Sequence, residues 1–306
     1  MNPSFQPALG AAQAAAGAQH YPAGALYVVA TPIGNLADIT LRALHLLGLV
    51  DAIACEDTRH TASLLQAYGL HRPLLALHQH NEAEAAIGVV ERLQRGERIA
   101  YVSDAGTPGI SDPGARLCAA VQAAGLRAIP LPGASSVTTL LSVTGLAATE
   151  TDAAFEFTGF LPTKGSARAQ ALRRLAQQPH ACVLLEAPHR IQTLAKDLVE
   201  LGERRVTLGR ELTKQFEQLV TLRCDELAGW LAADAMHGKG EFALALHPLA
   251  RVAASEDGPD AEALRVLKLL LAELPLKGAA RLAAEITGGS KNALYQAGLA
   301  LKPTAD

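Results

Sequence analysis

The sequence predicts an α/β protein with two α/β domains, followed by a small C-terminal helical module. From Leu26 onward, short apolar runs alternate with helical patterns, an alternation typical of a parallel sheet covered by helices. A second series of apolar runs follows, and the last part of the chain has helical periodicity only. We divide the chain into an extension, an N-terminal α/β domain, a C-terminal α/β domain, a linker and a helical tail, with the boundaries 1–24, 25–132, 133–248, 249–260 and 261–302.

Five strand-like runs define the first domain, and helical patterns separate them. The pattern after the fourth run places Pro113 at a first helical position behind Asp112, and it stops at Gly125. Strands separated in this way by helices predict a largely parallel sheet. The predicted strands are 26–30, 52–55, 74–77, 99–103 and 128–131.

The second domain contains five more strand-like runs in a different arrangement. The runs 204–209 and 218–223 stand close together without a helix between them. Because such neighbours form antiparallel pairs readily, we expect a mixed sheet in this half. The other predicted strands are 155–160, 181–186 and 241–246.

The helical tail is interrupted by Pro275, by the Gly288-Gly289 pair and by Ser290, which predicts three short helices joined by tight turns. Three such helices could form a helix-turn-helix-like module or a cap packed on the main body. The pattern alone favours the cap.

Composition and charge narrow the class of protein. A net charge of -3 gives no global attraction to nucleic acid, so any RNA contact has to come from a local patch. The four cysteines are widely spaced and form no CxxC pair, which favours buried thiols in a reducing compartment and predicts no metal site. They are Cys55, Cys118, Cys182 and Cys224.

Residues 1–24 are rich in Ala, Gly, Gln and Pro and contain neither Lys nor Arg. They lack a sustained apolar block as well, so we expect a disordered extension and not a signal peptide. No uncharged apolar run reaches the roughly 18 residues of a membrane span. We therefore expect a cytoplasmic protein.

Three loops stand at the carboxyl ends of predicted strands, where open α/β sheets bind their ligands. They are "TPIGN" (31–35), "SDAGTPGISDPG" (103–114) and "PGASS" (132–136). The first loop has neither the three glycines of a dinucleotide fingerprint nor the Gly-Lys-Ser/Thr of a phosphate loop. It is therefore not predicted to hold a phosphate.

The middle loop carries the strongest signal for a ligand. Gly106, Gly109 and Gly114 allow another molecule to approach the backbone closely, and Asp104 at the strand end can accept hydrogen bonds from amines or hydroxyls. No lysine lies in the loop, so nothing neutralises several phosphate charges. The loop suits a zwitterionic or ribose-bearing ligand, whereas Asp112 is interpreted as a helix cap.

Charged residues also follow the second and third strands. Glu56 and Asp57 could act in acid/base chemistry or anchor a substrate, or Asp57 could simply cap the next helix. The residues leave both alternatives open. His78 and His80 could face the same cleft, while Asn81 is a natural helix N-cap.

A basic segment lies early in the second domain. Residues 159–174 contain four cations and no acid, which makes them the clearest candidate for contacts with an RNA backbone. The alternative is a solvated helix face. The four cations are Lys164, Arg168, Arg173 and Arg174, and Lys277, Arg281 and Lys291 could assist from the tail.

In order along the chain, "TPIGNLADITLRA", "EDTRHT", "VSDAGTPGISDPG", "PLPGASS", "GFLP" and "RELTK" resemble the tetrapyrrole-methylase superfamily. Within it they are similar to the branch that methylates small-subunit ribosomal RNA. The resemblance implies two α/β domains with S-adenosylmethionine in the cleft between them. It also implies methylation of the ribose 2'-oxygen of a cytidine in the decoding region of 16S rRNA, and a homodimer.

The resemblance also implies roles for individual residues. Pro32 matches a residue of the first loop that lies against the cofactor, and Glu56, with Asp57 beside it, matches a proposed proton acceptor. Glu186 lies near a position that is apolar in tetrapyrrole enzymes. The remaining cofactor contacts are matched by Ser103, Asp104, Ala105, Gly106, Ile110, Ser135 and Ser136.

Two other functions are compatible with the same fold. The protein could methylate a tetrapyrrole or another small molecule, or it could be a non-catalytic RNA-binding assembly factor. The first loop and the Ser103-Asp104-Ala105 stretch differ from the glycine-rich and Gly-Asp-Pro patterns of tetrapyrrole enzymes, which favours the ribosomal branch. A dehydrogenase is disfavoured because the first loop lacks the necessary glycines.

Overall fold

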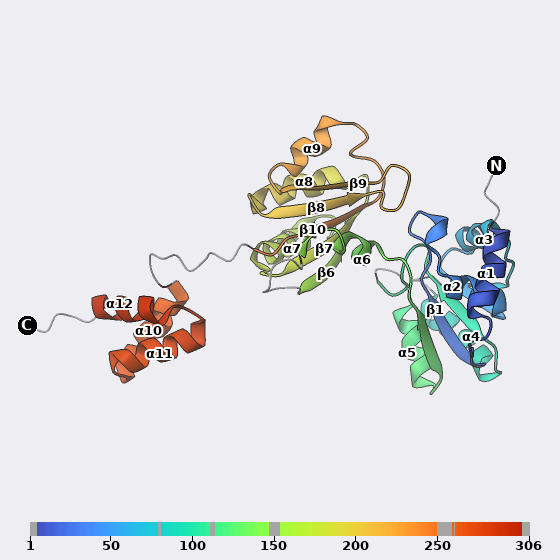
Figure 1. The fold of residues 1–306 in the computed structure, drawn as a ribbon, viewed down its shortest axis with the longest axis horizontal. Helices are drawn as coiled ribbons and strands as arrows, with labels where there is room; N and C mark the ends of the chain where they lie inside the picture. The colour runs from blue at the N-terminus through green and yellow to red at the C-terminus, as the bar shows by residue number, and fades with distance from the viewer. Residues whose placement is uncertain are drawn as a thin grey trace, which may run out of the picture. The chain divides into compact units, whose positions relative to one another are not determined.

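The computed structural model describes residues 5–78, 81–110, 114–146, 154–249, 259 and 261–301. The chain divides into two compact units, residues 1–248 and 249–306. The first unit holds both predicted α/β domains and the second holds the helical tail (Figure 1).

Among the described residues, the first domain contains a five-stranded parallel sheet in the order β3-β2-β4-β1-β5. The crossover between β1 and β2 leaves β4 between them, so the loops after β1 and β4 lie side by side. Each strand lies where an apolar run predicted it. The strands are β1 (Ala25–Val29), β2 (Ala52–Cys55), β3 (Leu74–Ala76), β4 (Ile99–Val102) and β5 (Arg127–Leu131).

Helices cover both faces of this sheet, which is why its strands are apolar on both sides. Tyr27 and Val29 of β1 point to the core formed with α2 (Leu41–Leu49) and α3 (Thr58–Ala67). Leu26, one residue out of phase, joins the core on the opposite face. That second core is formed with α4 (Glu82–Gln94) and α5 (Ala115–Ala123).

The prediction of a disordered N-terminal extension is wrong for the part of it that the structure describes. Helix α1 (Gln6–Ala16) packs on α2 (Figure 1), and its Ala12 is fully buried against Leu44 and Tyr68. The ring of Phe5 meets Tyr68 edge-on, with 5.2 Å between ring centroids. Alanine has the highest helix propensity, and its small side chain permits this close packing. Composition alone did not reveal the apolar partners, which come later in the chain.

The second domain contains the predicted mixed sheet, in the order β6-β7-β10-β8-β9. Strands β6 and β7 are parallel, and the other neighbours are antiparallel. The two strands without a helix between them, β8 and β9, form an antiparallel pair. The strands are β6 (Phe155–Phe160), β7 (Ala181–Glu186), β8 (Arg205–Arg210), β9 (Gln218–Arg223) and β10 (Phe242–Leu246).

The two faces of the second sheet pack against different partners. One face forms a large core with α7 (Gly165–Gln177), α8 (Ile191–Leu198) and α9 (Leu227–Ala233). The other face packs on α6 (Ser136–Leu141) through Leu140 and on the first loop through Ile33. The second sheet is thereby brought against the loops at the carboxyl ends of the first.

Helices α10 (Ala261–Glu273), α11 (Leu276–Thr287) and α12 (Lys291–Leu301) form the second compact unit. Their breaks fall at the predicted residues, and Gly288 adopts the left-handed conformation that ends α11. The three helices bury their apolar side chains against each other in a core of their own. The predicted three-helix module is therefore confirmed.

The start of α5 depends on an interaction that the sequence did not predict. The Glu82 carboxylate of α4 accepts hydrogen bonds from the backbone N–H groups of Gly114, at 2.9 Å, and Arg116, at 3.0 Å. These are orphan donors of a helix N-terminus. Asp112, the predicted cap, and Pro113 lie outside the described residues.

We expect Gly114→Ala to destabilise the protein by about 2–5 kcal/mol, because strain and overpacking add at this position. Gly114 has φ 121°, and a Cβ there would overlap the ring of the fully buried Tyr101. Urea unfolding followed by circular dichroism measures the effect. Gly125→Ala is the matched control, because Gly125 also has positive φ but nothing within 4 Å of its Cβ position. Equal losses of stability for the two variants would contradict the packing argument.

Candidate functional site

The first and middle loops are joined into one unit. The N–H of Thr31 donates to the carbonyl of Gly106 at 2.9 Å, and the N–H of Gly106 donates back at 3.1 Å. The Thr31 hydroxyl donates to the carbonyl of Ser103 at 3.2 Å, and the Ser103 hydroxyl donates to that of Gly106 at 3.1 Å. These bonds fix the backbone of both loops.

The third loop is held against the middle one. The Thr107 hydroxyl donates to the carbonyl of Ala134 at 3.0 Å. Gly106 has φ 84°, and a Cβ there would lie 3.3 Å from the Ile33 side chain. A Cβ on Gly133 would lie 2.8 Å from the Cβ of Ala30. Both glycines are therefore needed for the three loops to pack.

A cavity of about 420 Å³ opens between these loops and the second sheet. Its volume falls in the range of about 300–1,000 Å³ that small-molecule sites occupy. The side formed by the three loops combines the polar side chains of Asp104, Thr107, Ser135 and Ser136 with Ile33 and Ile110. Its second-domain side is mainly apolar, with Phe160, Leu185, Leu212 and Phe242 among its residues.

Most of the predicted cofactor contacts line this cavity: Asp104, Ala105, Gly106, Ile110, Ser135 and Ser136. The other two predicted contacts lie behind its wall. Ser103 is 1% exposed and its side chain holds the middle loop. Pro32 is buried and does not line the cavity, but its neighbour Ile33 does.

Sequence reasoning missed most of the second-domain side of the cavity. Leu185 and Phe242 lie in apolar strands and were indistinguishable from core residues. Thr107 lies in a loop that was already predicted to bind a ligand. Its hydroxyl was the one feature of the sequence that could have identified it as part of the site. Leu212, Glu241 and Ala243 reach the cavity only because the second sheet packs on the first loop.

Glu186 fixes the backbone that follows β7. Its side chain is fully buried, and its carboxylate accepts hydrogen bonds from the N–H of Ala187 at 3.0 Å and from Nε of Arg190 at 2.9 Å. Arg190 also donates to the carbonyl of Leu161. Because Ala187 and Pro188 line the cavity, this pair shapes its wall.

The structure separates the two candidate proton acceptors. The Asp57 carboxylate caps α3, accepting from the N–H groups of Arg59 and His60, and pairs with the Arg59 side chain at 3.1 Å. Its hydrogen bonds with Arg59 lower its pKa. These are the contacts of the helix cap that the sequence left open as the alternative.

Glu56 has the opposite electrostatic environment. Burial, followed by the negative charge of Asp104, raises the pKa of Glu56; Asp57 adds to the rise and His78 opposes it. The N–H of Asp57 donates to the Asp104 carboxylate at 3.3 Å, so the two strand ends are in direct contact. Glu56 does not itself line the cavity, but its carboxylate has an increased affinity for a proton, and the charge of the cavity-lining Asp104 contributes to this increase.

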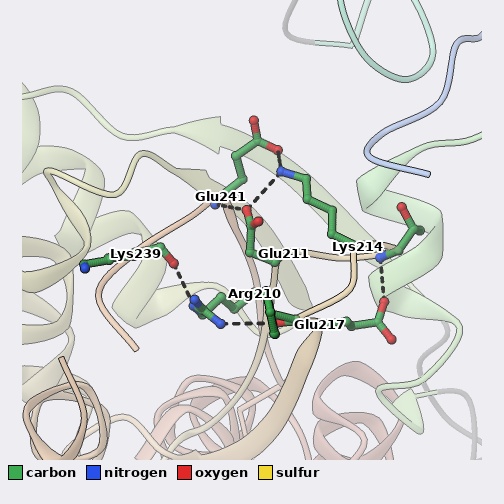
Figure 2. A network of polar contacts seen from close by, with 8 residues as sticks. Arg210, Glu211, Lys214, Glu217, Lys239 and Glu241 are labelled. Carbon is green, nitrogen blue, oxygen red and sulfur yellow. Dashed lines mark hydrogen bonds and ion pairs between the residues drawn. The ribbon is translucent and has the colours of Figure 1, made fainter. Parts of the chain in front are cut away.

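Glu241, which lines the cavity, belongs to a polar network (Figure 2). The Lys214 ammonium donates to Glu211 at 2.9 Å and to Glu241 at 3.0 Å. Burial opposes charge on both groups. The hydrogen bond from the Glu241 N–H, followed by the bond from Lys214, lowers the pKa of Glu211, and the bonds to the two carboxylates raise that of Lys214. The stem of Lys214 passes directly over Gly34, where a Cβ would overlap it. A residue of the second domain thus lies on the first loop.

The loop that carries Lys214 is strained. Glu211 and Thr213 have φ 51° and 67°, values that residues other than glycine rarely adopt. Arg210 holds the loop by donating to the carbonyl of Lys239 at 2.6 Å (Figure 2) and to that of Phe216 at 3.2 Å. Strain of this kind collects at functional sites.

Residues 25–228 match the family described as Tetrapyrrole (Corrin/Porphyrin) Methylases. The chain belongs to the tetrapyrrole methylase family. Residues 257–302 match a second description, RsmI C-terminal HTH domain. Of the two predicted alternatives for the tail, this match supports the helix-turn-helix-like module over the cap.

Curated relatives in the tetrapyrrole methylase family cover nearly the whole chain. Ribosomal RNA small subunit methyltransferase I of Pseudomonas aeruginosa is 48% identical over 279 residues, which are 90% of this chain and 97% of that protein. The protein of the same name from Escherichia coli O157:H7 is 49% identical over 275 residues, 89% and 94% of the two chains.

Solved structures share the family fold at lower identity. Cobalt precorrin-4 methyltransferase CbiF has a TM-score of 0.54 at 17% identity, covering 74% of this chain and 98% of its own. Diphthine synthase has a TM-score of 0.56 at 15% identity, covering 73% and 90%. Uroporphyrin-III C-methyltransferase from Thermus thermophilus, complexed with S-adenyl homocysteine, has a TM-score of 0.50 at 17% identity, covering 72% and 96%. The predicted fold class is confirmed.

One of the RNA contacts predicted for this family member, Arg168, is wrong. Arg168 is 7% exposed, and its guanidinium donates to Asp197 at 2.8 Å and to the carbonyl of Pro162 at 2.8 Å. It joins α7 to α8 and is not available to a phosphate. Its partner lies 29 residues away, which spacing along α7 could not reveal.

The other predicted RNA contacts are exposed. Arg173 and Arg174 lie on α7, Lys164 precedes its first turn, and Lys291 begins α12. None of the four makes an ion pair within the part of the chain that the structure describes. In the same unit as Lys291, Arg281 is paired with Glu285 at 2.9 Å.

Membrane-spanning helices and metal-binding clusters are both missing from the described ranges. None of the helices there has both the length and the apolar character of a membrane span. The same ranges contain no cluster of three His, Cys, Asp or Glu side chains placed to hold a metal ion. His80, a predicted neighbour of the cleft, lies outside these ranges.

Proposed function

We propose that this protein is an S-adenosylmethionine-dependent methyltransferase that modifies small-subunit ribosomal RNA. The proposed target is the ribose 2'-oxygen of a cytidine in the decoding region of 16S rRNA. The observation that carries this proposal is the cavity lined by Asp104, Ser135 and Ser136, in a chain that shares 48% identity with a small-subunit RNA methyltransferase across 90% of its length.

The two sides of the cavity fit the two parts of the cofactor. Its apolar side, with Leu212 and Phe242, suits a flat purine, and its polar side suits a ribose and an amino acid. The Asp104 carboxylate accepts hydrogen bonds from hydroxyl or ammonium groups. A fold relative was solved with S-adenyl homocysteine, which supports the same ligand here. When bound, the cofactor supplies a methyl group on a positively charged sulfur.

The protein contributes position and a proton acceptor. In-line displacement needs the ribose oxygen, the methyl carbon and the sulfur held in a row, with water excluded. The joined loops 31–35 and 103–107 provide a fixed backbone for this purpose. Glu56, beside Asp104, accepts the proton of the ribose hydroxyl in our proposal. Asp57 is retained as the less favoured acceptor, because it caps α3.

The RNA surface that we propose consists of Lys164, Arg173 and Arg174. We propose Lys291, in the helix-turn-helix unit, as a separate RNA contact. Replacing the first three by Ala should weaken RNA binding and reduce the slope of log K against log salt by about one for each phosphate that is no longer neutralised. Filter binding at several salt concentrations measures the slope. Arg127→Ala, an exposed cation of the first domain, is the control. An unchanged slope in the triple variant would remove this surface from the proposal.

The proposed function is tested by methyl transfer to two substrates. Small ribosomal subunits from a strain without this protein should accept one methyl group per particle, and a ribose-methylation map should place it on a single cytidine. A porphyrinogen should accept none. Transfer to the porphyrinogen alone would support the small-molecule alternative, and absence of cofactor binding would support the non-catalytic assembly factor.

We also propose that the protein is a homodimer, as its resemblance to the superfamily implies. Sedimentation equilibrium of the whole chain decides this point. A single species with the mass of one chain, 31.9 kDa, would contradict the dimer without affecting the proposed reaction.

A further inference from the structure

A second cavity, of about 360 Å³, lies between the edge strand β6 and helix α7. Its walls combine apolar groups with exposed polar side chains. The residues that matter here are Glu156, Phe160, Ala167, Gln170, Arg174 and Gln178. Neither the cofactor nor the transferred methyl group requires this space.

Phe160 connects the two cavities. It lines both of them, and 52% of its surface is exposed. A register shift between Phe157 and Gly159 interrupts the pairing of β6 with β7 just before it, and Gly159 has φ 68°. Bulges of this kind redirect a side chain next to a functional site. The exposed ring therefore stands between the proposed cofactor site and the second cavity.

Buried arginines fix the walls of the second cavity. Arg168 donates to the carbonyl of Pro162 at 2.8 Å, and Arg204 donates to those of Leu175 at 2.6 Å and Gln178 at 3.1 Å. All three acceptors belong to residues that line the cavity. The space is thus held open by the fold and does not depend on loosely placed side chains.

The chemistry of the lining matches a nucleotide. An exposed aromatic ring stacks on a base of any type, and the exposed guanidinium of Arg174 can bind a phosphate. The Gln178 amide donates to the Glu156 carboxylate, which leaves acceptors and donors for the edge of a base. Lys164 and Arg173 on the same helix region extend the positive charge beyond the cavity, as a continuing RNA strand would require.

We propose that the second cavity binds an unpaired nucleotide of the substrate RNA, a neighbour of the nucleotide that is methylated. This inference rests on the proposed function. Phe160 stacks on the base of that nucleotide and Arg174 contacts its phosphate, while the adjacent target ribose enters the first cavity. Unpaired bases displayed in this way are the usual targets of sequence-specific RNA binding.

The test fills the second cavity and leaves the first unchanged. Ala167 is an exposed residue of α7 that lines the cavity, and Ala169 is an exposed residue of the same helix that does not. We expect Ala167→Phe to raise the KM for small ribosomal subunits about 10-fold or more, the effect of removing one base–aromatic stacking interaction. Ala169→Phe should match the wild type. Both variants should keep the wild-type affinity for S-adenosylhomocysteine in calorimetry.

Photocrosslinking provides a second readout that does not depend on catalysis. Subunit RNA containing photoreactive thiouridine should crosslink to the peptide that carries Phe160 or to α7, and Ala167→Phe should abolish the crosslink. Equal KM values and equal crosslinks for the two variants, with an active wild-type enzyme, would overturn this inference alone. A wild-type protein that neither binds nor methylates the subunit would instead overturn the proposed function.

Discussion

Replacing Glu56 by Gln is expected to slow methyl transfer by about 100- to 10,000-fold, the usual contribution of a positioned general base. A ribose hydroxyl is a weak nucleophile at neutral pH, and the amide of Gln cannot accept its proton. The rate is measured in single turnovers, with enzyme in excess over small ribosomal subunits, so that product release does not hide the chemical step. Cofactor affinity, measured by calorimetry, should remain close to that of the wild type.

Asp57→Asn is the matched control, since it changes a neighbouring carboxylate that caps α3. We expect its thermal midpoint and its single-turnover rate both to stay near the wild-type values, because Asn caps a helix about as well as Asp. A slow Asp57→Asn enzyme beside a normal Glu56→Gln enzyme would transfer the role of proton acceptor to Asp57. Wild-type rates in both variants would show that neither carboxylate acts as a general base.

The raised pKa of Glu56 gives this prediction a pH dependence. Burial and then the charge of Asp104 favour the protonated form, whereas a proton acceptor must be ionised. The wild-type rate should therefore rise with pH through a pKa above the usual value for glutamate, and this limb should be absent from Glu56→Gln.

The same shift in the pKa of Glu56 affects stability. Because the folded-state pKa lies above the unfolded value, the stabilisation from Glu56 is present at acid pH and is lost as pH rises through the folded-state pKa. We therefore expect Glu56→Gln to be at least as resistant to urea as the wild type at neutral pH.

Replacing Asp104 by Ala is expected to weaken binding of S-adenosylhomocysteine by about 10- to 100-fold. A hydrogen bond to a charged group contributes about 1.5–3 kcal/mol, and Asp104 is the carboxylate of the middle loop that lines the first cavity. Isothermal calorimetry measures the dissociation constant directly. Asp104→Asn, which keeps one acceptor oxygen without the charge, should fall between the wild type and Asp104→Ala.

Two controls separate recognition from folding. Asp104 also accepts the N–H of Asp57, so the circular dichroism spectrum and thermal midpoint of each variant have to be compared with those of the wild type. Asp38→Ala removes an exposed carboxylate that does not line the cavity, and it should bind the cofactor normally. A folded Asp104→Ala variant with unchanged affinity would contradict the assignment of this residue.

The strands were predictable because each is a short apolar run bounded by breaks. The first sheet is buried on both faces, and its strands are therefore continuous in their hydrophobicity. The close spacing of β8 and β9 revealed the mixed second sheet in the same way. In contrast, α1 was mistaken for disorder because its stability comes from packing against Leu44 and Tyr68, not from a pattern within the helix.

The side of the site formed by the three loops was predictable because loops rich in Gly, Pro and Ser at strand ends are unusual unless they bind something. Asp104, Ser135 and Ser136 were found in this way. Leu212 and Phe242 were not, because an apolar residue carries no sign of whether it faces a core or a cavity. The prediction that Arg168 contacts RNA was wrong for a related reason, since the carboxylate that neutralises it comes from α8.

The glycine of "TPIGN" is constrained by the far half of the chain. Gly34 lies under the stem of Lys214, and a Cβ at position 34 would overlap this stem, so the lysine that now pairs with two carboxylates would have to shift. The space for a side chain at this position is therefore limited by a residue of the second domain. A glycine in a loop after the first strand would ordinarily be attributed to nucleotide binding. Here the stem of Lys214 occupies the space that a side chain at position 34 would need.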